Sequence, residues 1–311
     1  MTQAFAIQAK GLVKQFDAVR AVDGVDLAVP AGMIYGVLGP NGAGKTTTLR
    51  TLLGIIDPDS GERSLLGHTD PLKAASRVGY LPEERGLYPT MHAREAIAFM
   101  GALRGLPLAE GRIRAGRLLE EHGLGHAARR PIRTLSKGMA QTVQILGTIV
   151  HEPSLIVLDE PFSGLDALNQ GRLEALIRAQ VAAGVTVLFS THVIAHAERL
   201  CERIAIIVGG RVRFEGSVAD ARGRMQPVVT LVTRREHGPW QDALPPGARR
   251  DGRSWTFDLP EGGIEPLLAR LIDGDAGIEA LSIERPGLHD VFVDIVGASV
   301  TKEMDAVEEA Q

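Results

Sequence analysis

Residues 39–46 read Gly39-Pro40-Asn41-Gly42-Ala43-Gly44-Lys45-Thr46, and they directly follow the apolar run Ile34 to Leu38. A GxxxxGKT pattern after such a run predicts a buried strand, a glycine-rich turn and a helix that begins near Lys45. Glycines let the backbone aim successive N–H groups at phosphate oxygens, and the helix N-terminus adds about half a positive charge. The stretch therefore predicts a site for the phosphates of a nucleotide.

The side chains of this loop suit particular atoms of ATP and its magnesium ion. We expect Lys45 to bridge the β- and γ-phosphates, the Thr46 hydroxyl to hold Mg²⁺, and Thr47 to donate to a neighbouring phosphate. An ordinary glycine turn that happens to precede a lysine is the alternative. The loop residues expected to bind nucleotide are Gly39, Pro40, Asn41, Gly42, Ala43, Gly44, Lys45, Thr46 and Thr47.

A second apolar run, Leu155 to Leu158, ends in the adjacent acids Asp159 and Glu160. Open α/β sheets place ligands at the carboxyl ends of their strands. Asp159 suits the Mg²⁺ shell, directly or through water. Glu160 is then placed to polarise an attacking water, because phosphoryl transfer depends mainly on positioning and charge stabilisation. The alternative is a strand that merely ends in a solvated acidic turn.

The regions around these motifs predict an α/β fold with two domains. Short β segments over residues 5–38 indicate an N-terminal antiparallel β subdomain, and three- and four-residue apolar spacing indicates a helical insert at about 90–152. We expect the nucleotide-binding domain to span 1–222. A small α+β domain is expected at 223–297, followed by a flexible tail at 298–311.

Composition and charge limit the function classes. The 311 residues carry 34 basic and 38 acidic side chains, a net charge of −4, so no positive field is present to attract nucleic acid. Cys201 is the only cysteine, which excludes an intrachain disulfide. The N-terminus lacks a secretory pattern and no apolar run approaches the roughly 20 residues of a membrane span, which favours a cytoplasmic protein.

A third motif, Leu135-Ser136-Lys137-Gly138-Met139, lies twenty residues before Leu155. It resembles the LSGGQ signature, with matches at Ser136 and Gly138 and departures at Lys137 and Met139. Together with the two motifs above, it makes the chain resemble an ABC-type nucleotide-binding domain. The resemblance implies that this segment closes over ATP held by another subunit, so that a second copy or a related subunit completes each site. A helix cap with no nucleotide role is the alternative for Ser136.

Two further segments resemble family motifs. Ser163-Gly164-Leu165-Asp166 is similar to the D-loop that links the two sites, and Ser190-Thr191-His192 is similar to the switch whose histidine contacts the γ-phosphate. The resemblance implies nucleotide-site roles for Asp166 and His192, with His192 steadying the developing charge. A structural histidine, or a metal pair of His192 with His196, is the alternative.

Two more positions are assigned through the same resemblance. Phe16 occupies the place of the adenine-stacking aromatic, with core packing as the alternative. Glu83 replaces the usual Q-loop glutamine, and its carboxylate can approach Mg²⁺ or the attacking water. Residues 83–105 are where family members engage the transmembrane partner.

The close of the expected C-terminal domain, Pro286 to Val293, resembles the ending of the ATPase subunits of bacterial sodium-extruding and drug-efflux exporters. This implies an ATP-hydrolysing subunit of an ABC transporter that powers export through a separate permease. Such a subunit lies in the cytoplasm, peripherally on the inner face of the cell membrane. A soluble ABC-type mechanoenzyme is the alternative, and a P-loop kinase is a third class that leaves the signature and D-loop without a role.

Overall fold

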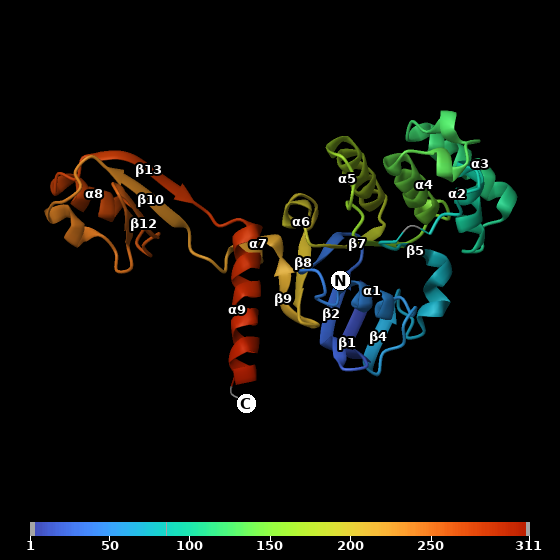
Figure 1. The fold of residues 1–311 in the computed structure, drawn as a ribbon, viewed down its shortest axis with the longest axis horizontal. Coiled ribbons are helices and arrows are strands. Elements are labelled where there is room, and N and C mark those ends of the chain that lie inside the picture. Colours follow the sequence, from blue (N-terminus) through green and yellow to red (C-terminus); the bar gives the residue numbers. More distant parts are fainter. Residues whose placement is uncertain (1–3, 85, 309–311) are drawn as a thin grey trace. The chain divides into compact units, whose positions relative to one another are not determined.

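A six-stranded sheet lies at the centre of the first part of the computed structural model, which describes residues 4–84 and 86–308, with side chains as far as residue 298 (Figure 1). The strands run in the order β5-β6-β7-β3-β8-β9, and all neighbours are parallel except β8 and β9. Every residue of β3, β6 and β7 is buried, as expected for parallel strands covered on both faces. The bounds are β3 (Ile34–Leu38), β5 (Val78–Leu81), β6 (Leu155–Asp159), β7 (Thr186–Thr191), β8 (Arg203–Val208) and β9 (Arg211–Ser217).

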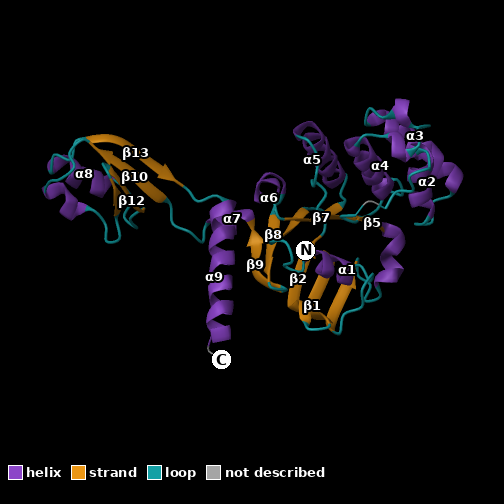
Figure 2. Cartoon of the chain, viewed as in Figure 1, coloured by secondary structure: helices purple, strands orange, loops and turns teal. Residues whose placement is uncertain are grey.

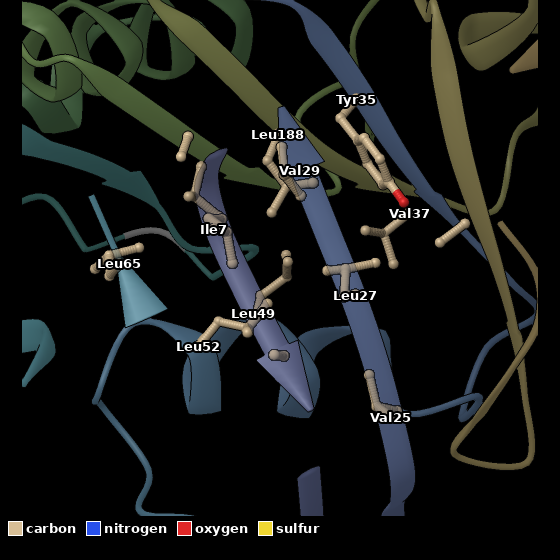
Figure 3. Close-up of a cluster of buried hydrophobic side chains, with 14 of the residues drawn as sticks. Ile7, Val25, Leu27, Val29, Tyr35, Val37, Leu49, Leu52, Leu65 and Leu188 are labelled. Atoms are coloured by element: carbon tan, nitrogen blue, oxygen red, sulfur yellow. The ribbon is translucent and has the colours of Figure 1, made fainter. Parts of the chain in front are cut away.

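A smaller antiparallel sheet, in the order β2-β1-β4, packs against one face of the central sheet. Its strands are β1 (Phe5–Phe16), β2 (Val19–Pro30) and β4 (Ser60–Leu65). Helix α1 (Lys45–Leu52) adds its apolar side to the same core. Figure 3 shows this shared cluster, to which the antiparallel sheet, the central sheet and α1 contribute Ile7, Val25, Leu27, Val29, Leu65, Tyr35, Val37, Leu188, Leu49 and Leu52.

Helices α5 (Ala167–Ala182) and α6 (Ile194–Leu200) lie on the opposite side of the central sheet from α1 (Figures 1 and 2). The approach of α6 is close: a Cβ at Gly36 of β3 would come within 2.7 Å of the Cys201 sulfur. The central sheet is therefore covered on both sides.

The helical insert lies between β5 and β6 and consists of α2 (Ala93–Ala102), α3 (Leu108–Glu121) and α4 (Lys137–Ile149). Helix α2 packs against both α3 and α4. Its buried residues include Ala93, Ile97 and Gly101, which recur at helical spacing. This is the insert that the apolar spacing predicts. The 3₁₀ helices are η1 (Pro71–Arg77), η2 (Gly125–Ala127), η3 (Ile132–Thr134) and η4 (Pro239–Ala243).

The chain divides into two units, Met1–Val218 and Ala219–Gln311. The second is α+β, with a four-stranded antiparallel sheet in the order β11-β12-β10-β13 among the described residues. One face of this sheet shares a core with α8 and the buried Trp240. The remaining elements are α7 (Val218–Arg222), β10 (Val228–Thr233), β11 (Arg249–Asp251), β12 (Ser254–Asp258), α8 (Glu265–Asp273), β13 (Ile278–Glu284) and α9 (Leu288–Glu308).

Two observations concern the boundaries expected for this unit. The division falls after Val218, the first residue of α7, whereas the boundary expected from the sequence falls after residue 222, the last residue of α7. Helix α9 continues to Glu308 and so occupies most of the segment 298–311 that is expected to be a flexible tail, whose last residues, 309–311, lie outside the described part. Within the described residues, none of the helices combines enough length and hydrophobicity to cross a lipid bilayer.

Candidate active site

The turn between β3 and α1 is the predicted phosphate loop, and its glycines meet neighbouring backbone. A Cβ at Gly39 would come within 2.3 Å of the Ile207 carbonyl oxygen, and one at Gly44 within 2.1 Å of the Ala21 carbonyl oxygen. Gly44 is also the N-cap of α1 and has a left-handed φ of 96°. Glycine is therefore required at both positions because the neighbouring strands β8 and β2 leave no room for a side chain. This reason adds to the close approach of phosphate that the sequence indicates.

Lys45 points into the loop rather than into solvent. Its side chain is 6% exposed, and Nζ donates to the carbonyl oxygens of Gly39 at 2.8 Å and Pro40 at 3.2 Å. Nζ also lies 3.3 Å from Oε1 of Glu160, at the end of β6. The loop and the acidic strand are thus joined by a buried ion pair.

Asp159 is fully buried and accepts two hydroxyl donors on one oxygen. The Thr46 hydroxyl lies 3.1 Å from Oδ1, and the Ser190 hydroxyl lies 2.6 Å from the same atom. Oδ2 is also buried but has no hydrogen-bond partner. The strand register explains the second contact, because Asp159 and Ser190 are paired residues of the neighbouring strands β6 and β7.

Glu160 lies between the side chains of Lys45 and His192. Its Oε1 is 3.3 Å from Lys45 Nζ and 3.0 Å from His192 Nδ1, although it makes no hydrogen bond. The residue is 8% exposed and has a left-handed φ of 47°, which is uncommon for a residue with a Cβ. Its N–H donates to the Ser190 hydroxyl at 3.0 Å. This backbone turn places the carboxylate of Glu160 beside the phosphate loop.

These residues fit a magnesium ion. The Thr46 hydroxyl and the Asp159 carboxylate adjoin at the end of the loop, and Oδ2 is a buried carboxylate oxygen without a partner. Hard oxygen atoms of this kind are the protein ligands that Mg²⁺ prefers, with phosphate oxygens and waters completing its shell.

A cavity of about 390 Å³ opens beside the two acids. Glu83, exposed after β5, lines it together with Asp159 and Glu160. Lys137, at the first position of α4, lines the same cavity. Two of the three departures from the family motifs, Glu83 and Lys137, therefore lie beside the acids at the end of β6, and they carry opposite charges.

The signature and D-loop segments meet each other. Ser136 caps α4 by accepting from the Met139 N–H at 3.3 Å, and Asp166 caps α5 by accepting from the Asn169 N–H at 2.8 Å. A Cβ at Gly138 would come within 2.7 Å of the Asn169 side-chain nitrogen, so the close approach at this glycine is to α5. Among the described residues, no side-chain hydrogen bond joins these segments to the phosphate loop.

Two aromatic contacts bear on the alternatives. Phe16, at the end of β1, is 45% exposed, which argues against core packing. His196 stacks on Phe162, with ring centroids 4.1 Å apart, and its Nδ1 lies 3.7 Å from Glu174. Burial lowers the pKa of His196. The described residues contain no cluster of three or more His, Cys, Asp or Glu suited to a metal, which gives the pairing of His196 with His192 no support.

Ser190 is the site residue whose role the sequence pattern does not indicate. It appears in the switch motif only as the residue two before His192. The available clue is that β6 and β7 are both buried runs that end in polar residues, but which strands are neighbours follows from the tertiary fold.

Comparison with known proteins identifies the family. The sequence profile described as ABC transporter matches residues 22–163. The daunorubicin/doxorubicin resistance ATP-binding protein DrrA of Streptomyces peucetius is 40% identical over 306 residues, covering 94% of this chain and 92% of that protein. The chain belongs to the ATP-binding subunits of ABC transporters. It is also 35% identical to the Nod factor export ATP-binding protein I of Cupriavidus metallidurans over 299 residues, 94% of this chain and 97% of that protein.

A solved structure of the ATP binding subunit of an ABC transporter matches with a TM-score of 0.65 and 33% identity, covering 70% of this ABC subunit and 92% of that chain. The predicted family and fold class are therefore confirmed, as is an ATP-hydrolysing role in transport. Neither relative's name indicates a soluble mechanoenzyme or a kinase.

Proposed function

We propose that this ABC subunit powers an exporter by closing, in pairs, around two MgATP molecules and hydrolysing them. One observation carries the proposal: Glu160 Oε1, almost fully buried, lies within 3.3 Å of Lys45 and 3.0 Å of His192. A buried carboxylate between a phosphate-binding lysine and a histidine is placed for water activation beside a γ-phosphate.

The chain's own residues divide the chemistry. The γ-phosphate takes the place of Glu160 at Lys45 Nζ, which leaves the carboxylate free to accept a hydrogen bond from the attacking water. His192, on the other side of Glu160, donates to the γ-phosphate and steadies the developing charge. Thr46 and Asp159 would hold Mg²⁺, which would neutralise phosphate charge. Glu83 lines the same cavity as both acids, from where its carboxylate would approach the magnesium ion or the attacking water.

The remaining nucleotide contacts come from three positions. Phe16, exposed at the end of β1, stacks on the adenine. Ser136 and Gly138 at the start of α4 hold the γ-phosphate of ATP bound to the opposite subunit, and Asp166 links the two sites. Support for this arrangement is that Ser136 and Asp166 cap helices that approach each other at Gly138, and among the described residues neither side chain hydrogen-bonds to the phosphate loop. The second subunit is another copy or a related chain.

A separate permease carries the substrate, and this subunit lies on the cytoplasmic face of the membrane. Support comes from the names of the relatives, one a resistance protein and one an export protein. Tyr88 and Leu103 are exposed apolar side chains within residues 83–105, the segment proposed to contact the permease. Arg85 of that segment lies outside the described residues.

Mixing two inactive variants tests the composite site. Lys45→Ala disables the phosphate loop and Ser136→Arg disables the signature, so each variant alone loses turnover. A head-to-tail dimer of the two contains one intact site, and mixing is expected to restore up to about a quarter of the wild-type rate, if subunits pair at random and each site works independently. If the ATPase rate of the mixture is no higher than the sum of the rates of Lys45→Ala and Ser136→Arg measured separately, the proposal is contradicted. Mixing Lys45→Ala with a Lys45→Ala, Ser136→Arg double variant is the control.

Reconstitution tests the export proposal. The permease that co-purifies with Glu160→Gln in MgATP is placed in lipid vesicles with wild-type subunit, and ATP-dependent movement of an anthracycline is followed by fluorescence. We expect outward-directed transport that is lost with Lys45→Ala. Inward movement, or none in the presence of active ATP hydrolysis, would contradict drug export.

A further inference from the structure

One buried hydroxyl contacts both acidic residues of the site. Ser190, at the carboxyl end of β7, donates to Asp159 Oδ1 at 2.6 Å and accepts from the Glu160 N–H at 3.0 Å. Ser190 and Asp159 are both fully buried. We infer that Ser190 is a positioning residue that sets the orientation of both carboxylates for ATP hydrolysis, and this inference rests on the roles proposed for Asp159 and Glu160.

The direction of both hydrogen bonds at the Ser190 hydroxyl follows from the chemistry of its partners. A serine hydroxyl has one proton to donate and two lone pairs that accept. The carboxylate of Asp159 can only accept, and the peptide N–H of Glu160 can only donate, so a single orientation of the hydroxyl satisfies both bonds. The Asp159 carboxylate cannot rotate, and the Glu160 peptide cannot turn, without breaking a buried hydrogen bond, which is costly in the absence of water.

For Asp159, the consequence is an asymmetric carboxylate. Oδ1 receives both hydroxyl donors, Ser190 at 2.6 Å and Thr46 at 3.1 Å, while Oδ2 has no partner. Thr46 is itself proposed to bind the metal, so its hydroxyl oxygen also serves that ion, whereas the Ser190 hydroxyl does not. Ser190 is then the hydroxyl that keeps Oδ1 in place and leaves Oδ2 to the metal shell.

For Glu160, the consequence is the direction of the side chain. Its left-handed φ of 47° is disfavoured by contact between Cβ and the backbone, so the surrounding structure must hold it. The Ser190 oxygen accepts from the N–H of this same residue. Without that acceptor the peptide is free to turn, which would carry the carboxylate away from Lys45 and His192.

The same strand provides a matched control. Thr186, at the amino end of β7, is 2% exposed, and its hydroxyl accepts from the Gly32 N–H at 2.9 Å. Both hydroxyls are buried and bonded to a backbone N–H, but Thr186 contacts neither acid. Thr186→Val and Ser190→Ala therefore each remove a buried hydroxyl, and only the second disturbs the carboxylates.

The experiment compares three quantities in these variants. These are kcat for ATP hydrolysis, the ATP dissociation constant with and without Mg²⁺ in a Glu160→Gln background, and urea unfolding. For Ser190→Ala we expect kcat to fall at least about tenfold and the Mg²⁺-dependent gain in ATP affinity to shrink at least about threefold. ATP affinity in EDTA stays within about twofold, because Lys45 and the loop amides are unchanged. Thr186→Val changes urea unfolding alone.

Ser190→Cys gives a second test that does not depend on the alanine variant folding. A thiol is a weak donor and acceptor but packs well in an apolar interior. We expect its kcat to lie between those of wild type and Ser190→Ala while its resistance to urea equals or exceeds that of Ser190→Ala.

The inference would be overturned if kcat and the Mg²⁺-dependent gain in ATP affinity did not depend on the Ser190 hydroxyl. If the folded Ser190 variants keep kcat and the Mg²⁺-dependent gain within about twofold of wild type, or if Thr186→Val changes them equally, the hydroxyl serves folding only. The proposed function fails separately, through Lys45→Ala retaining the wild-type rate.

Discussion

Replacing Glu160 with glutamine should move hydrolysis and ATP binding in opposite directions. Hydrolysis should fall by about 10²- to 10⁴-fold, because an amide cannot take up a proton from the attacking water. ATP should bind more tightly, because the γ-phosphate no longer competes with a carboxylate that lies 3.3 Å from Lys45 Nζ. The change keeps the size of the side chain, so packing beside the 390 Å³ cavity is little altered.

The size of the binding change follows from the ion pair. Unit charges about 4 Å apart interact by about 4 kcal/mol at an effective dielectric constant of about 20, and the cost of desolvation offsets much of this. Lys45 retains the carbonyls of Gly39 and Pro40 as acceptors. We therefore expect a net gain of about 1.4 kcal/mol, or about tenfold in affinity, and a nucleotide-free protein that is less stable than wild type by about 3 kcal/mol, the low end for a broken buried pair.

Three assays separate these effects: phosphate release, equilibrium ATP titration, and urea unfolding with and without ATP. Glu174→Gln is the control, since Glu174 is a partly buried carboxylate that pairs with Arg199 and His196 away from the loop. Turnover within about threefold of wild type, or ATP binding that is weakened tenfold, would refute the role given to Glu160.

Three further changes give distinct outcomes. His192→Ala should lower turnover at least about tenfold but alter ATP affinity less than about threefold, as measured by phosphate release and titration, because His192 contacts Glu160 and lies at the edge of the site. Phe16→Ala should weaken ATP and GTP by a similar factor, equivalent to about 1 to 3 kcal/mol of lost stacking, and selective loss of ATP alone would contradict a stacking role. Burial lowers the pKa of His151 below its ordinary 6.5, although the Val78 carbonyl opposes the shift. The unfolded chain then binds the proton more readily than the folded protein, so the free energy of unfolding is highest above about pH 6.5 and falls as the pH drops toward the lowered pKa. His151→Gln should therefore lose less stability than wild type in urea unfolding between about pH 7 and pH 5. An equal loss in the two proteins would contradict this.

The parts of the site that depend on local sequence were predictable. The apolar run before Gly39 becomes β3, helix α1 begins at Lys45, and the two acids lie at the carboxyl end of the buried strand β6. The helical insert also follows from apolar spacing that is visible in the sequence. In each case one short segment contains both the pattern and the structure that it predicts.

The contacts that complete the site were not predictable in the same way. The order of β6, β7 and β3 brings Ser190 beside Asp159, and this order is a property of the whole sheet. The left-handed backbone of Glu160 has no sequence marker, because glycine or asparagine would normally indicate such a turn. Helix α9, which extends beyond the apolar pattern of residues 288–296, also lies outside what local spacing indicates.

Equilibrium binding of ATP to wild type and to Lys45→Ala tests the central claim most directly, with the exposed Lys73→Ala as the control. Loss of one charged hydrogen-bond donor to phosphate should cost about 1.5 to 3 kcal/mol, so the dissociation constant of Lys45→Ala should rise about 10- to 150-fold while Lys73→Ala matches wild type. An affinity for Lys45→Ala within about twofold of wild type would show that the loop after β3 does not hold the terminal phosphates.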